Sequence, residues 1–107
     1  MSSRGRPKKY RYVRHDPQIS LFSPRGKAGR PDEVNLSVDE FEAMHLADFI
    51  GLAQKQAAES MHISQQTFSR VLKKARRKVA EAIVSGKIIK IQGGTYVISR
   101  KEEPQKT

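Results

Sequence analysis

Apolar residues recur at helical spacing in the second half of the 107-residue chain. After residue 63 they are separated by steps of three, one, three, four and three, at Phe68, Val71, Leu72, Ala75, Val79 and Ala82. Such steps place them on one face of a helix with about 3.6 residues per turn. Ser64 is a good N-cap and Gly86 a good terminator, so we expect a long helix over residues 65–85.

Two shorter helices are expected before it. In VNLSVDEFEAMHLADFIG, Ser37 and Glu40 form a capping box in which each side chain accepts from the other's backbone N–H, and Gly51 suits the helix exit. A helix over Gln54–Met61 follows, and its two adjacent alanines permit close approach to the long helix.

The last two of these helices form a helix-turn-helix pattern. Apolar residues flank the tight turn and secure one helix to the other, at Met61, Ile63, Phe68 and Val71. His62 stands where such a turn often has Gly, so it must take left-handed geometry at some local strain. Ala53 is a poor N-cap where Ser or Thr would serve. The pattern survives both departures and favours DNA binding over a chance helical hairpin.

The end of the chain changes to a period of two. In KIIKIQGGTYVIS, the pair Gly93-Gly94 can supply the positive φ angles of a type I′ turn, and pairing outward from it places four apolar residues on one face: Ile89, Ile91, Tyr96 and Ile98. We therefore expect a β-hairpin. A lone hairpin is marginal in water, so this face should pack on the helices or on a second subunit, which leaves a homodimer open.

The first 31 residues are rich in Arg, Lys, Gly, Pro and Ser and show no helical or strand period. They are expected to form an extended, mobile, basic arm. The chain then divides into this arm (1–31), a helix-turn-helix domain (32–86), the hairpin (87–99) and a polar tail (100–107). The expected fold class is mainly α, with three helices, a short C-terminal β-hairpin and a basic N-terminal arm.

One stretch of the arm has the core of an AT-hook, in which arginines enter the minor groove of A·T-rich DNA. Its residues are Arg4, Gly5, Arg6, Pro7, Lys8 and Lys9. A basic tail drawn to phosphates without groove preference is an equal alternative. The second Gly-Arg-Pro triplet, residues 29–31, precedes Asp32 and Glu33, which phosphate would repel, so we expect a turn there before the first helix.

Charge is unevenly distributed along the chain, whose net charge is +10. Residues 1–30 sum to +8, residues 31–63 to −6 and residues 64–107 to +8. Six cations fall within the nine residues from Arg70 to Lys78, with no acid on that helix until Glu81. Such a run repels itself unless an anion compensates it, which indicates surfaces dedicated to a polyanion.

Other function classes find little support. The chain has no Cys, and its three His share no carboxylate constellation typical of a metal site, so we expect no metal and no cofactor. No nucleophile-base-acid set indicates an enzyme. No apolar stretch is long enough for a membrane span, and no apolar region follows the basic N-terminus as in a signal peptide. We expect a cytoplasmic protein.

Groove geometry assigns roles on the long helix, because B-DNA's major groove admits one helix whose N-terminal residues reach base edges. Base contacts are expected from Gln65, Gln66, Ser69 and Arg70. Phosphate contacts are expected from Ser64, Thr67, Lys73, Lys74, Arg76 and Arg77. Thr67 has capping as its alternative role, and Lys74 has plain solvent exposure.

Several stretches together resemble known families. ISQQTFSRV resembles the recognition-helix entry of lactose-repressor-type proteins, and residues 39–83 resemble region 4 of bacterial sigma factors. The fuller resemblance is to the prokaryotic family called domain of unknown function 134, predicted DNA-binding proteins. It spans roughly residues 4–94 and is carried by RGRPKK, Phe22 with Pro24-Arg25-Gly26, the Leu36–Asp48 helix, the helix-turn-helix, and Gly86-Lys87 before Gly93-Gly94.

This resemblance implies a three-helix fold like sigma region 4 and DNA binding. Some relatives extend into a Cys-bearing tail; this chain has no Cys, so no metal or redox role carries over. The leading hypothesis is sequence-specific binding of double-stranded DNA by a transcriptional regulator. The alternatives are a nucleoid-type architectural protein of low specificity, and a module that binds RNA polymerase through the acidic first helix.

Overall fold

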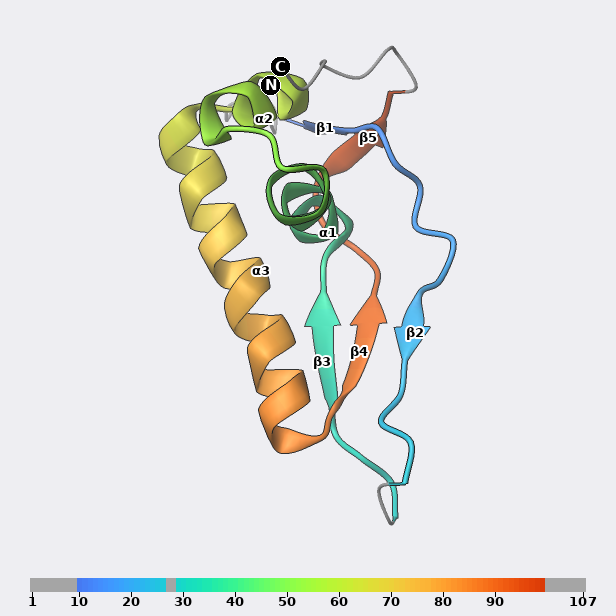
Figure 1. Cartoon of the computed structure of the whole chain (residues 1–107). Coiled ribbons are helices and arrows are strands. Elements are labelled where there is room, and N and C mark those ends of the chain that lie inside the picture. The colour runs from blue at the N-terminus through green and yellow to red at the C-terminus, as the bar shows by residue number, and fades with distance from the viewer. Residues whose placement is uncertain (1–9, 27–28, 100–107) are drawn as a thin grey trace, which may run out of the picture.

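The computed structural model describes residues 10–26 and 29–99. Figure 1 shows a long helix, α3, that runs along one side of the molecule beside a small sheet, with the other helical segments at one of its ends. The elements in chain order are β1 (Arg11–Val13), β2 (Leu21–Phe22), β3 (Glu33–Leu36), α1 (Val38–Met44), the π-helix η1 (His45–Ile50), α2 (Gln54–Met61), α3 (Gln65–Ser85), β4 (Ile88–Ile91) and β5 (Tyr96–Ile98).

The first helix begins as its capping box predicts. Ser37 Oγ accepts from the Glu40 backbone N–H at 3.3 Å, and Glu40 Oε1 accepts from the Ser37 N–H at 2.9 Å. The helix continues through η1 to Gly51, whose N–H donates to the Leu46 carbonyl at a φ of 89°. Before Ser37, residues 33–36 form strand β3, which the sequence did not predict.

The α2–α3 helical pair is joined by a tight turn that takes the expected shape. His62 is left-handed, with φ at 58°, and is the one described residue other than Gly with positive φ. Its ring stacks on Tyr12 with 3.8 Å between centroids, a contact that holds β1 against this turn. Ser64 caps α3, Ala53 makes no side-chain cap, and Gly86 ends α3 at a φ of 66°.

The predicted β-hairpin is wrong, because β4 and β5 do not pair with each other. β4 lies in the middle of a three-stranded sheet, antiparallel to β2 and parallel to β3, whereas β5 pairs in parallel with β1 (Figure 1). A hairpin would satisfy the backbone hydrogen bonds along only one edge of each strand. The observed pairing satisfies both edges of β4 and gives the three strands before the helices their partners, which a marginal two-stranded ribbon cannot do.

The double glycine does have positive φ at both positions, 79° at Gly93 and 102° at Gly94. It serves as a crossing between the two sheets instead of a tight turn. The Gly93 carbonyl accepts from the Val38 N–H at 3.0 Å, and the Thr95 carbonyl accepts from the Arg11 N–H at 3.3 Å. The loop thereby ties the start of α1 to the start of β1.

The expectation of an arm without secondary structure is wrong for residues 10–26, which contain β1 and β2. The AT-hook-like residues 4–9 lie outside the described residues. Gly29 bends with φ at 78° where a turn was expected, but the strand β3, which was not expected, lies between this bend and α1. With five strands beside the helices in the described residues, the domain is a mixture of α and β, so the prediction of a mainly α fold is right for the helices alone.

Two apolar clusters meet on the inner side of α3. Near its N-terminus, Phe68 and Leu72 pack with Leu46 and Met61 from η1 and α2. Further along, Ala75 packs with apolar side chains of α1 and of the strands: Val13, Leu36, Val38 and Ile91. This packing fixes one face of α3 and leaves the opposite face outward. No helix among the described residues is long and apolar enough to cross a membrane.

A substitution at Gly94 tests the crossing loop. Gly94→Ala is expected to lower the free energy of unfolding by about 2 kcal/mol, because positive φ is strained for Ala and its Cβ would meet the buried Asp39 carboxylate. Gly93→Ala is the matched control: φ is also positive, but nothing lies within 4 Å of its Cβ position. Urea unfolding should show a smaller loss for Gly93→Ala; equal losses would rule out the steric contact with Asp39.

Candidate nucleic-acid interface

The first turn of α3 is held by hydroxyl groups. Ser64 Oγ accepts from the Thr67 N–H at 3.0 Å and donates to Thr67 Oγ1 at 2.9 Å. Thr67 therefore takes part in capping, the alternative role that the sequence left open. The cap leaves the positive end of a 21-residue helix at the surface, beside Gln65 and Gln66, both of which are exposed.

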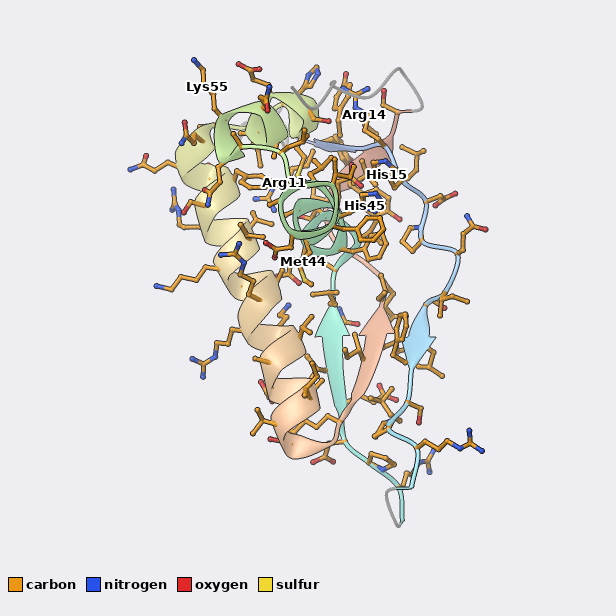
Figure 2. The ribbon with its side chains drawn as sticks, viewed as in Figure 1. Arg11, Arg14, His15, Met44, His45 and Lys55 are labelled. Carbon is orange, nitrogen blue, oxygen red and sulfur yellow. The ribbon has the colours of Figure 1, made fainter. Side chains whose placement is uncertain are left out.

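The outer face of α3 carries the remaining cations and amides. Arg70, Lys73, Lys74 and Arg77 are all exposed, and none makes a hydrogen bond or an ion pair with the part of the chain that the structure describes. Figure 2 shows long side chains ending in nitrogen that project from this side of α3 away from the other helices. Uncompensated cations in a row are unfavourable in a free protein and suit a polyanionic partner.

Two cations of the same run are instead paired within the protein. Both Arg76 nitrogens Nε and Nη2 donate to Asp48 on η1, at 3.0 and 2.6 Å, and this bond holds the pKa of Asp48 below its usual value. Lys78 Nζ donates to Glu40 on α1 at 2.8 Å. The sequence assigned Arg76 to phosphate, but its guanidinium already has a carboxylate partner 28 residues away in the chain.

Arg70 and Lys74 also line a cavity of about 610 Å³ between α1, α3 and the Gly94–Thr95 loop. The opposite wall carries two acids of α1: Asp39 Oδ2 binds Arg11, and Glu40 binds Lys78 and its own cap. Asp39 Oδ1 is buried without a hydrogen-bond partner among the described residues. The exposed charged groups of the cavity, Arg70 and Lys74, are cationic.

Arg11 of β1 lies beside the start of α3. A second cavity, of about 250 Å³, is lined by Arg11, Ile63, Ser64 and Thr67. The segment before Tyr10, which holds the AT-hook-like residues, therefore joins the described chain next to the first turn of α3. The sequence could not place this junction, because nothing local predicts the pairing of β1 with a strand 85 residues later.

A buried polar cluster fixes β1 to α1 and α2. Glu42 is completely buried and accepts from the Arg14 backbone N–H at 3.0 Å and from His15 Nδ1 at 3.0 Å. The Arg14 guanidinium donates to Ser60 Oγ and its carbonyl oxygen, at 3.3 and 3.2 Å. His15 also stacks on His45, with 3.7 Å between ring centroids (Figure 2).

Nothing in the sequence indicated that His15 stacks on His45 or contacts Glu42. The cluster nevertheless does not form a metal site: among residues 10–26 and 29–99, no three His, Asp or Glu side chains come together as metal ligands would. Its hydrogen bonds instead position the strand that precedes the α2–α3 pair.

Lys55 is a further cation that the sequence analysis did not assign. It is exposed on the first turn of α2 and projects into solvent on the side that also carries the first turns of α3 (Figure 2). Lys55 is the only Lys or Arg between residues 31 and 63, and an isolated Lys gave no signal in the sequence.

Comparison with known proteins gives a family but no activity. The model of the family described as "Protein of unknown function DUF134" matches residues 1–99. UPF0251 proteins of Prosthecochloris aestuarii, Caldicellulosiruptor bescii and Thermoanaerobacter sp. strain X514 are 48, 49 and 43% identical over 92, 86 and 92% of this chain. The chain spans 63, 64 and 88% of these relatives. No solved structure matches it significantly. The chain belongs to the DUF134, or UPF0251, family.

Proposed function

We propose that this protein binds double-stranded DNA, with the first half of α3 in the major groove, and that it regulates transcription. The observation that carries the proposal is the unpaired row of amides and cations on the outer face of α3. The α2–α3 pair has the short turn, left-handed His62 and capped second helix of a helix-turn-helix, and its core contacts leave that row facing outward.

The row divides by its distance from the N-terminus of α3. Gln65, Gln66, Ser69 and Arg70 occupy the first turns, where amide and guanidinium groups can pair with base edges. Lys73, Lys74 and Arg77 lie further along and suit phosphates, which fix the position of the helix without reading sequence. Lys55 at the start of α2 adds a cation on the same side.

The buried acids of α1 weigh against the polymerase-binding alternative. Asp39, Glu40 and Glu42 are 3, 7 and 0% exposed, and each binds a group of this chain. The first helix therefore does not offer a partner the acidic surface that its sequence suggested.

Selection of bound duplexes from a random library tests the proposal and separates its forms. A transcriptional regulator should enrich a defined motif of several base pairs. A low-specificity architectural protein should enrich only A·T-rich duplexes. If the protein retains no more DNA than a control without protein, the result would contradict DNA binding.

The affinity for DNA should depend steeply on salt, because each neutralised phosphate releases counterion. The contacts at Lys73, Lys74 and Arg77 predict a slope of log K against log salt of about −3 or steeper, measured by fluorescence anisotropy. Lys73→Ala should reduce the slope by about one. Arg76→Ala is the control: since Arg76 binds Asp48, its loss should change the slope less. A slope near zero for the wild type would exclude the phosphate contacts.

A further inference from the structure

The outer face of α3 changes character along its length. Val84 follows Gln66 by 18 residues, which is five turns at 3.6 residues per turn, so both lie on the same outward line. The cations end at Lys78, and the exposed residues after it include Ile83 and Val84, 73 and 84% exposed. A helix that is apolar on its core face and again on its outer face normally has a second partner.

A hollow lies beside Ile83. It measures about 350 Å³ and is lined by Phe22 of β2 and Pro24 after it, by Ala82 and Ile83 of α3, and by Ile89 of β4. Phe22, the last residue of the short edge strand β2, is 50% exposed and lies on the same face of the sheet as its partner Ile89, towards α3. We call the surface made by Phe22, Ile83, Val84 and this hollow the distal patch.

We propose that the distal patch is the interface through which two copies of this chain form a two-fold dimer. A two-fold interface brings the same surface together from both subunits, so it must carry projecting groups and a place that receives them. The distal patch carries both side by side: Ile83 and Val84 project, and the hollow between α3 and β2 can receive an aliphatic side chain of the other copy.

Charge permits a second copy at this surface. Two chains that each carry a net charge of +10 repel wherever their cations approach. Among the described residues that line the hollow, the one cation, Lys87, is paired with Glu81 at 2.6 Å. The patch is thus locally neutral beside a helix half that is strongly basic.

The area indicates an association of modest strength. The three exposed side chains together offer roughly 400 Å² of apolar surface, in the range of functional patches on single subunits. Two such surfaces would bury about 800 Å², well below the standard size for a stable interface. We therefore expect a weak dimer that forms at high micromolar concentrations and is strengthened when both copies bind one DNA molecule.

The position of the patch, taken with the proposed DNA binding on which this step rests, predicts the form of the target. Val84 lies about 27 Å along the helix axis from Gln66 at 1.5 Å per residue, so pairing through the distal patch leaves both N-terminal halves of α3 free. A two-fold dimer should then bind an inverted repeat more tightly than a single half-site.

Sedimentation or light scattering of the full chain at rising concentration tests the dimer without DNA. The mass should rise from 12.1 kDa towards twice that value. The double variant Ile83→Glu/Val84→Glu should remain monomeric, although it lowers the net positive charge and so weakens repulsion between chains. Ile83→Ser/Val84→Ser, a milder change, should weaken dimerisation at least tenfold. Circular dichroism should show both variants folded, because both side chains are exposed.

Phe49→Glu is the matched control, since Phe49 is 82% exposed but lies on η1, away from the distal patch. It should leave the dimer intact. A wild type that stays monomeric both alone and on an inverted repeat would overturn the proposal, as would a dimer that survives both double variants. A dimer that fails to bind DNA would instead refute the proposed function while leaving the interface established.

Discussion

Glu42→Ala is expected to lower the free energy of unfolding by about 3–5 kcal/mol, a large fraction of the stability of a small domain. The carboxylate is completely buried and accepts from the Arg14 backbone N–H and from His15 Nδ1. Its removal leaves two partly buried donors without this acceptor and a void where the completely buried side chain was. Urea unfolding followed by circular dichroism measures the loss.

The position of Glu42 allows a sharp control. Glu59→Ala removes an exposed acid from α2 and should change stability by no more than about 0.5 kcal/mol. Glu42→Gln keeps the shape of the side chain and one acceptor oxygen. Its loss in free energy of unfolding should therefore fall between those of Glu42→Ala and Glu59→Ala. A Glu42→Ala protein as stable as Glu59→Ala would show that the buried cluster does not hold β1 to the helices.

The ends of the helices could be predicted from the sequence because each depends on a few neighbouring residues. Ser37 and Glu40 satisfy each other's backbone groups within one turn, and Ser64 does the same for the first turn of α3. Gly51 and His62 end their helices in left-handed geometry. The spacing of the apolar residues also predicted the apolar face of α3, and this is the face that packs in both clusters.

The strand pairing could not be predicted, because it joins residues far apart in the chain. Gly93-Gly94 has the positive φ angles that a type I′ turn requires, but a crossing loop uses the same angles. Tertiary contacts decide between these two uses: β1 lies 85 residues from the strand it pairs with, and the four helical segments α1, η1, α2 and α3 separate β3 from β4 in the chain. A two-residue strand such as β2 has too few residues to show a period.

The candidate site shows the same division. The row of cations could be read from residues 70–78, but which of them remain free depends on acids from other elements. Asp48 forms an ion pair with Arg76, which lies 28 residues later in the chain, and Glu40 forms one with Lys78, 38 residues later. Helical spacing alone cannot show these pairs, so the sequence did not reveal that Arg76 and Lys78 have partners within the protein.

Arg70 and Lys74, one helical turn apart, provide the most discriminating test of how α3 would meet DNA. Arg70 lies near the N-terminus of α3, where base edges are within reach, so Arg70→Ala should cost about 1–3 kcal/mol of binding free energy and relax preference at one base pair. Lys74 lies deeper, so Lys74→Ala should weaken all sequences alike and lower the salt slope by about one at most.

Both variants should melt close to the wild type, because both side chains are exposed and neither makes a hydrogen bond or ion pair with the described residues. Anisotropy titrations on matched duplexes that differ at single base pairs separate the two effects. The proposed docking predicts a change of base preference for Arg70→Ala alone. If Lys74→Ala alters base preference while Arg70→Ala lowers only the salt slope, the helix enters the groove by its central turns. The cavity between α1 and α3, which both residues line, would then face the bases instead of the backbone.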